Sequence, residues 1–359
     1  MNVRPASFVL AFCAGVSICG CERVVDSPPI RAVGPDPDSA LVTIALPLKS
    51  LVPLAPRYVR ELSDTQYLAA DARSRAVWLL STDSASSPVQ VVTLERDDAK
   101  AVAGLAVGST ELGVLLSDGS VRVFARTDWS EIQTIPYGVG GTVRPLGIEA
   151  SGEGEWAVLA EEMRGGAGGT DRVAVLVLRR VAPDEQDVLW ERPKWRLAEL
   201  GPEARDLSSL TSDGKTVLIG GSHPPRIVTY ESGTEFREIQ LREVPQRRLT
   251  AADMRAQRRV IAQVPPEFRE RIPVHDTYPA LLKAWRSNDG IAVVGAGEGD
   301  SVMLDWYCGD TYERTLLAGV QVRNVWPLQQ GVAFLRVDSS QTEYSLEIFT
   351  AEQMDMSCE

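Results

Sequence analysis

The residues most able to do chemistry in this chain are few, and their spacing gives little support for catalysis. The chain has two histidines, His223 and His275, and neither has another His or a Cys at metal-ligand spacing. No Gly-x-Ser-x-Gly elbow and no phosphate-binding loop occur, so the usual serine hydrolase and nucleotide hydrolase signatures are missing. Residues 165–171 form one glycine-rich run, which we interpret as a hairpin loop because calcium-binding glycine repeats come in several copies. These residues favour binding over catalysis, without a cofactor.

The amino-terminal residues predict export and attachment to a membrane. Arg4 precedes an apolar run, residues 8–18, that is too short for a bilayer span and is typical of a signal peptide. The following Ile18-Cys19-Gly20-Cys21 resembles the lipobox of bacterial lipoproteins, with an aliphatic residue at −3, a small one at −2 and Gly at −1. The resemblance implies a signal peptide over residues 1–20 and acylation of Cys21, for example with palmitate. The alternative is an ordinary secretory signal or an uncleaved anchor.

The acylated Cys21 would attach the protein to a membrane of the bacterial cell envelope, most simply the outer membrane on its periplasmic or surface face. Residues 21–40 are rich in Pro, Ser and Asp, which predicts an extended tether between the anchor and the folded domain. The net charge of −12 argues against a nucleic-acid partner, because the averaged field repels phosphates.

Two further cysteines belong to the mature chain, Cys308 and Cys358. In an oxidising compartment such a pair often forms a disulfide, which would pin the carboxyl-terminal tail, residues 350–359, to the fifth repeat. Two free thiols are the alternative, because sequence does not show whether the two residues come within reach.

The clearest folded pattern runs from Val102 to Ile135. Four short β-rich runs are separated by Gly, Ser and Asp turns, with a tight hairpin at residues 117–120. This predicts one four-stranded antiparallel sheet, and weaker copies recur along the chain. The sequence therefore predicts an all-β fold over residues 41–349, a six-bladed β-propeller of four-stranded antiparallel blades. Seven blades would also fit the length.

The ends of this region predict how the ring closes. The last repeat has three runs only, at residues 320–326, 331–336 and 344–349. Residues 41–46 form a lone strand pattern that cannot be stable unpaired. We expect this amino-terminal strand to become the fourth, outer strand of the last blade.

Between the fourth and fifth repeats the β pattern lapses, over residues 244–274. Apolar residues recur there at three- and four-residue spacing, which predicts one inserted amphipathic helix. Its other face carries Arg255, Arg258 and Arg259 on an otherwise acidic protein. Two interpretations stay open: a docking surface for an acidic partner, or a cap whose arginines pair with acidic loops.

The last third of the chain carries a family resemblance. Residues 268–273, Phe-Arg-Glu-Arg-Ile-Pro, are followed by Asp276-Thr277-Tyr278-Pro279-Ala280 and a strand with an Asp-Gly turn. Together with the closing stretch at residues 337–348, they resemble the NHL- and TolB-like six-bladed β-propellers of bacterial envelopes. Most such relatives have no assigned reaction, so the resemblance implies the fold more than the function.

The resemblance also implies one enzymatic alternative. Six-bladed propellers include metal-dependent lactonases, in which carboxylates and an Asn hold a divalent ion such as calcium at the channel mouth. Here Asp206, Asp276 and Asn324 are the residues that could take those roles. The blades do not repeat acidic residues at matching positions, which favours scattered surface carboxylates instead.

The sequence thus favours a lipid-anchored propeller that binds a protein or an envelope polymer. We expect the recognition surface at Arg255, Arg258 and Arg259, with His275 and Tyr278 beside the helix. A purely structural spacer is the third alternative.

Overall fold

The fold is taken from a computed structural model, and all of the residues that it describes belong to the unit formed by residues 32–359. The described residues are 40, 42–46, 56–71, 75–83, 87–94, 100–137, 142–165, 173–196, 207–222, 225–231, 234–241, 251–262, 269, 281–287, 290–296, 302–309, 311–319, 322–329, 331–337 and 344–358.

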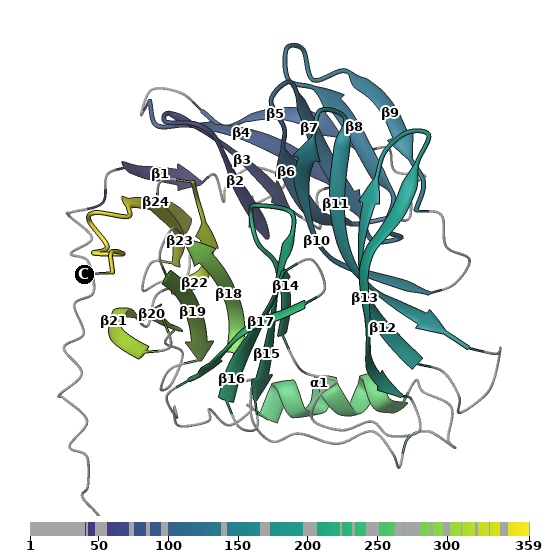
Figure 1. Cartoon of the computed structure of the whole chain (residues 1–359). Coiled ribbons are helices and arrows are strands. Elements are labelled where there is room, and N and C mark those ends of the chain that lie inside the picture. The colour runs from purple at the N-terminus through teal and green to yellow at the C-terminus, as the bar shows by residue number, and fades with distance from the viewer. Residues whose placement is uncertain are drawn as a thin grey trace, which may run out of the picture. The chain divides into compact units, whose positions relative to one another are not determined.

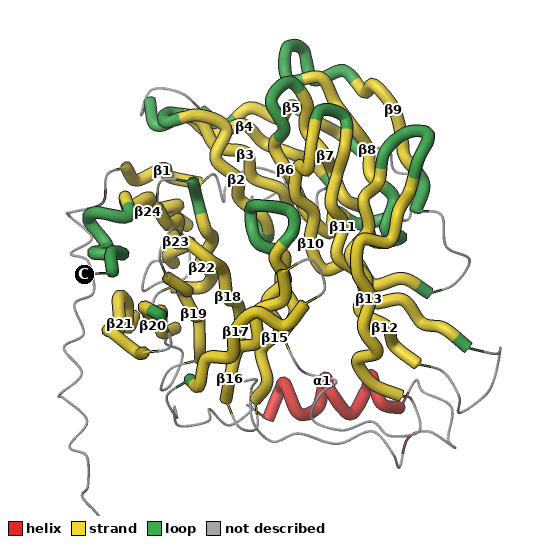
Figure 2. The backbone as a smooth tube through the Cα atoms, viewed as in Figure 1, coloured by secondary structure: helices red, strands yellow, loops and turns green. Residues whose placement is uncertain are grey.

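Twenty-four strands account for most of the described residues (Figures 1 and 2). The strands are β1 (Val42–Leu46), β2 (Tyr58–Ser63), β3 (Gln66–Asp71), β4 (Ala76–Ser81), β5 (Val89–Thr93), β6 (Val102–Val107), β7 (Glu111–Leu116), β8 (Val121–Ala125), β9 (Glu131–Ile135), β10 (Val143–Gly152), β11 (Glu155–Arg164), β12 (Val173–Val181), β13 (Gln186–Arg196), β14 (Leu207–Leu210), β15 (Thr216–Ser222), β16 (Pro225–Glu231), β17 (Thr234–Gln240), β18 (Leu281–Ser287), β19 (Gly290–Ala296), β20 (Val302–Cys308), β21 (Thr311–Gly319), β22 (Val322–Pro327), β23 (Gly331–Val337) and β24 (Tyr344–Thr350).

Within the described residues these strands form six four-stranded sheets, and every pairing is antiparallel. Sheets one to five follow the chain: β2 to β5, β6 to β9, β10 to β13, β14 to β17, and β18 to β21. Sheet six has the order β1-β24-β23-β22, so its outer strand comes from the opposite end of the sequence. The register of β1 on β24 runs from Val42 opposite Ile348 to Leu46 opposite Tyr344.

The hydrophobic core consists of six clusters, and each cluster joins two successive sheets. For example, Trp306 of sheet five packs with Phe334 and Phe349 of sheet six. Val59 of sheet one packs in turn with Leu335 of sheet six, so the last sheet meets the first. Strands β2, β6, β10, β14, β18 and β22 start the sheets and contact one another from sheet to sheet around most of this circle. The six sheets therefore form a closed ring.

Tight turns account for the hairpin signals of the sequence. Gly119 has a φ of 87°, a left-handed conformation that favours glycine, between β7 and β8. The backbone N–H and the hydroxyl of Ser120 both donate to Asp118 Oδ1, at 3.0 and 2.6 Å. Such Asx contacts explain why Ser-Asp-Gly-Ser makes a reliable turn.

Sheet three differs from the others in length. Its strands have nine to eleven residues, whereas the strands of sheet two have five or six. The sequence did not predict this extension, because the charged residues Glu161, Glu162 and Arg164 indicate the end of a strand. Two arginines, Arg164 and Arg179, offset the buried charge of Glu162 there.

One helix, α1 (Ala251–Ala262), comes between β17 and β18 in the described part of the chain and lies outside the six sheets (Figure 1). In the residues described, no helix has both the length and the apolar character needed to cross a membrane.

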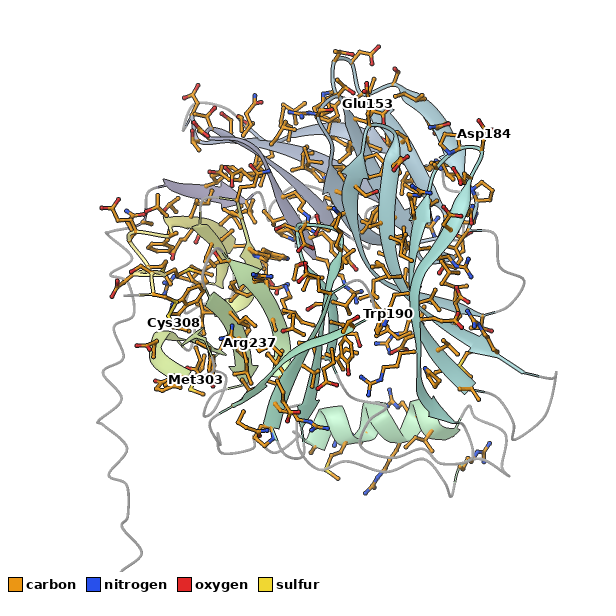
Figure 3. The ribbon with its side chains drawn as sticks, viewed as in Figure 1. Glu153, Asp184, Trp190, Arg237, Met303 and Cys308 are labelled. Atoms are coloured by element: carbon orange, nitrogen blue, oxygen red, sulfur yellow. A yellow bond between two sulfur atoms is a disulfide. The ribbon has the colours of Figure 1, made fainter. Side chains whose placement is uncertain are left out.

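The carboxyl-terminal segment packs on sheets five and six. Met354 and Met356 are buried in the cluster that contains Trp306, and Trp306 Nε1 donates to the carbonyl oxygen of Ser357 at 3.3 Å. A disulfide joins Cys358 to Cys308, which lies at the end of β20 (Figure 3). The tail is thus covalently held to sheet five.

Candidate functional site

The innermost strands of four sheets carry two bonded pairs of polar side chains, Arg60 with Glu149 and Lys283 with Asn324. Arg60 lies on β2, Glu149 on β10, Lys283 on β18 and Asn324 on β22. Because these strands border the axis of the ring, their side chains can meet although the residues are far apart in sequence. We call Arg57, Arg60, Glu149, Lys283 and Asn324 the central cluster.

Arg60 and Glu149 form the ion pair of this cluster. Arg60 Nη2 donates to Glu149 Oε1 at 2.5 Å, and Arg60 Nε donates to the carbonyl oxygen of Leu105 on β6 at 2.8 Å. The side chain of Glu149 is only 12% exposed. Burial raises the pKa of Glu149 to about 7; the charge of Arg60 opposes this shift and that of Asp213 adds to it.

Lys283 is the second unusual ionisable group. Its ammonium donates to Asn324 Oδ1 at 2.6 Å and to the carbonyl oxygen of Val325 at 2.7 Å. Lys283 Nζ also lies 5.0 Å from the centre of the Trp326 ring, a cation–π distance. Burial lowers the pKa of Lys283 to about 7, and the positive charges of Arg60 and Arg57 lower it further.

Lys283 is the member of the central cluster best suited to acid–base chemistry. A lysine whose pKa is near 7 could act as a base. Both hydrogen-bond acceptors of the Lys283 ammonium are neutral oxygens, however, and no described side chain is bonded to it as an acid or a nucleophile.

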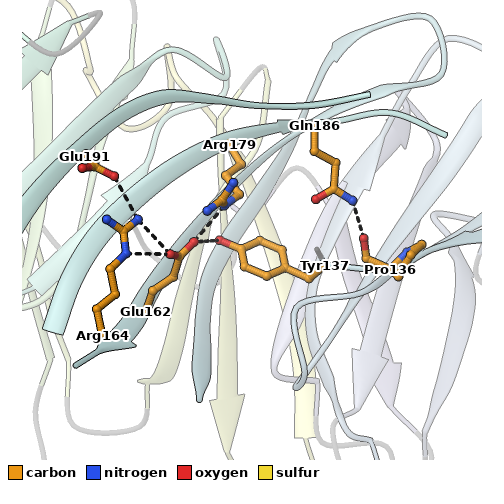
Figure 4. Close-up of polar contacts among 7 residues, drawn as sticks. All are labelled: Pro136, Tyr137, Glu162, Arg164, Arg179, Gln186 and Glu191. Carbon is orange, nitrogen blue, oxygen red and sulfur yellow. Dashed lines mark hydrogen bonds and ion pairs between the residues drawn. The ribbon is translucent and has the colours of Figure 1, made fainter. Parts of the chain in front are cut away.

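A second polar cluster lies in the extension of sheet three (Figure 4). Glu162 is 1% exposed, and it accepts from Arg179 Nε at 2.8 Å and from Arg164 Nη2 at 2.9 Å. The Tyr137 hydroxyl donates to Glu162 Oε1 at 2.9 Å. Arg164 also pairs with Glu191 on β13, at 2.9 Å.

The polar contacts of Glu162 satisfy its charge. Burial alone would raise its pKa, but the hydrogen bonds from Arg179, Arg164 and Tyr137 outweigh burial and lower the pKa of Glu162. Tyr137 follows β9 of sheet two, so this cluster ties sheets two and three together. We interpret it as structural.

Apart from the disulfide cysteines, the site residues predicted from sequence lie on α1, in the central cluster or outside the described part of the chain. Arg255, Arg258 and Arg259 lie on α1 with exposed side chains. Asn324 belongs to the central cluster, where Lys283 occupies its amide oxygen. The predicted residues outside the described part of the chain are Cys21, Asp206, His275, Asp276 and Tyr278.

The metal alternative stays a prediction. No group of three or more His, Cys, Asp or Glu that could hold a metal ion exists in the part of the chain that is described. Two of the three proposed ligands, Asp206 and Asp276, lie outside that part.

Sequence reasoning did not find Arg60, Glu149 or Lys283. Each lies in an otherwise apolar or alternating strand, Tyr58–Ser63, Val143–Gly152 or Leu281–Ser287. A charged residue near the middle of an innermost strand was the available signal, because a charge that is largely buried there needs a partner.

A closed ring of six four-stranded antiparallel sheets defines a six-bladed β-propeller, as the strand pattern predicted. No protein-family model and no curated protein matches the chain.

The solved structures similar to this chain include two β-propeller domains, at very low sequence identity. The WD40 beta propeller domain of Doa1 is 9% identical, with a TM-score of 0.46 over 88% of this chain and 98% of that one. YCF48 bound to D1 peptide is 10% identical, with a TM-score of 0.46 over 86% and 96%. The beta-propeller domain of Cps50 (Swd1) from Myceliophteria thermophila is 8% identical, with a TM-score of 0.43 over 86% and 100%.

Proposed function

We propose that this chain is a lipid-anchored protein of the bacterial cell envelope that acts as a binding scaffold for a protein or an envelope polymer. Propellers commonly serve as interaction scaffolds because they gather loops from every blade on a rigid frame. The lipobox-like Ile18-Cys19-Gly20-Cys21 supports the anchor, and the Pro-rich residues 22–40 would hold the propeller away from the membrane. We also propose that the chain is related to the NHL- and TolB-like propellers, because residues 268–280 and 337–348 resemble theirs.

The observation that carries the binding function is the basic face of α1. Arg255, Arg258 and Arg259 are spaced three and four residues apart, so they share one helix face. All three side chains are exposed. They make no hydrogen bond or ion pair with another residue in the described part of the chain. Exposed arginines without a partner among the described residues, on a protein of net charge −12, favour a docking surface for an acidic partner.

We also propose that the pairing of β1 with β24 is what closes the ring in the mature protein. The pairing covers an edge of sheet six that would otherwise be exposed. It places the strand that follows the tether inside the folded domain.

The anchor is tested with Cys21→Ala in a bacterial host. We expect loss of palmitate labelling and a shift of the protein from the membrane fraction to the soluble fraction. Equal labelling and unchanged membrane association of the variant would refute the anchor.

The docking surface is tested by crosslinking in membranes with Arg258→Glu. The matched control is Lys215→Glu, which makes the same change of charge at an exposed turn of sheet four. We expect crosslinked partners to be lost with Arg258→Glu and kept with Lys215→Glu. Equal recovery in both variants would count against α1 as the docking surface.

A further inference from the structure

Among the described residues, three cationic side chains interact at the centre of the ring, Arg57, Arg60 and Lys283, beside the carboxylates of Glu149 and Asp213. Arg57, Arg60 and Lys283 act on one another there, since both arginines lower the pKa of Lys283. Trp326 links two of them: its Nε1 donates to the carbonyl oxygen of Arg57 at 2.9 Å, and its ring lies under Lys283. Of the three cations, Arg60 forms an ion pair with a described carboxylate, that of Glu149.

Lys283 itself has neutral partners. Its ammonium has three N–H groups, and two of them donate to Asn324 Oδ1 and to the carbonyl oxygen of Val325. Among the residues described, no carboxylate forms an ion pair with it. A largely buried ammonium without an opposite charge is unfavourable, so an added anion would gain from this position.

Further donors surround the same place. The Arg60 guanidinium uses Nε for Leu105 and Nη2 for Glu149, which leaves Nη1 without a bond to the described residues. Asn324 accepts with its amide oxygen, and its NH₂ group donates to none of the described residues. Arg57 is exposed, and its charge acts on Lys283.

We propose that Lys283, Arg57 and Arg60 form a binding site for an oxyanion, the carboxylate or phosphate group of a ligand that enters the centre of the ring. The site offers N–H donors from several directions and a positive field, the two features that oxyanions require. A divalent cation does not suit it, because the Lys283 ammonium already occupies the oxygen of Asn324. This site is independent of the lipid anchor and of the α1 surface.

The test is calorimetric titration of the full-length protein in detergent at pH 6, with inorganic phosphate and with sodium acetate. Sodium chloride at equal ionic strength is the control for screening. We expect saturable binding of an oxyanion and none of chloride. Tighter binding of acetate would assign a carboxylate ligand, and tighter binding of phosphate would assign a phosphate ligand.

Three variants locate the binding. Lys283→Gln should weaken it about tenfold or more, as expected when a charged hydrogen bond is lost. Arg57→Gln should weaken it severalfold; because Arg57 is exposed, this variant is not expected to disturb folding. Arg226→Gln, at an exposed position on β16 where the side chain pairs with Glu238 of the outer strand β17, should leave the affinity unchanged.

Two results would overturn the proposal. One is the absence of saturable binding of either oxyanion beyond the chloride control. The other is binding by Lys283→Gln and Arg57→Gln with the affinity of the unmodified protein. Both are separate from the anchor experiment, which measures labelling and fractionation through Cys21.

Discussion

Glu149 and Glu162 are both buried glutamates paired with arginine, yet the same substitution should have opposite effects on them. Glu149 has one arginine, Arg60, and burial dominates. Glu162 has two arginines and a tyrosine hydroxyl, and its hydrogen bonds dominate. We therefore expect Glu149→Gln to stabilise the protein at pH 8 and Glu162→Gln to destabilise it.

The magnitude for Glu149 follows from its pKa. A rise from 4.5 to about 7 means that the folded state disfavours the ionised carboxylate by roughly 3 kcal/mol. The folded protein holds this proton more tightly than the unfolded chain, so the group's contribution to stability is full below pH 4.5 and is lost as the pH rises to about 7. Glutamine keeps an acceptor for Arg60 and carries no charge. Glu149→Gln should therefore raise the free energy of unfolding by almost nothing at pH 4.5 and by about 3 kcal/mol at pH 8.

Glu162→Gln should change the free energy of unfolding in the opposite direction. The folded-state pKa of Glu162 is lowered, so its stabilising contribution is present at neutral pH and falls away as the solution becomes acidic. Glutamine at this position leaves the Arg179 guanidinium without its buried counter-charge, at a cost of about 3 kcal/mol near pH 8.

The assay is urea unfolding followed by circular dichroism, with the disulfide intact, at pH 4.5 and pH 8. The reasoning fails if Glu149→Gln is less stable than the unmodified protein at pH 8. It also fails if the gain is the same at both pH values, since then charge is not its cause.

Three further predictions concern the frame. Cys358→Ser opens a loop of 50 residues and should lower the free energy of unfolding by about 4 kcal/mol, measured in urea; a loss below about 1 kcal/mol would contradict this. Ile44→Ala should cost about 2–5 kcal/mol if β1 is part of the core, against about 0.5 kcal/mol for the half-exposed Ile132→Ala, and equal losses would show that β1 contributes little. Gly290→Ala places a Cβ 2.3 Å from the Trp306 ring and should cost about 1–3 kcal/mol, seen as a lower melting temperature; an unchanged value would show that the ring can move away.

The strand framework could be predicted because its signals are local. Alternating apolar residues and turns such as residues 117–120 mark each hairpin within a short window of sequence. The predicted four-stranded repeat from Val102 to Ile135 matches β6 to β9.

The central cluster could not be predicted in the same way. Arg60 and Glu149 are 89 positions apart, and Lys283 and Asn324 are 41 apart. Their contacts depend on how six separate sheets are turned around one axis, which no local pattern encodes. Asn324 was singled out from sequence as a metal ligand, and its partner Lys283 was not, because a lone lysine normally indicates a solvated position.

The pairing of β1 with β24 also affects the order in which the protein can fold. Val42 pairs with Ile348, about 300 positions later, so sheet six cannot be completed until nearly the whole polypeptide has been synthesised. If the protein is exported, the first five sheets reach the far side of the membrane before β24 does. Until then β1 has no partner strand and the ring stays open. A periplasmic holdase, or slow release from the export machinery, would then matter more for the yield of this protein than for one whose first and last strands fold independently.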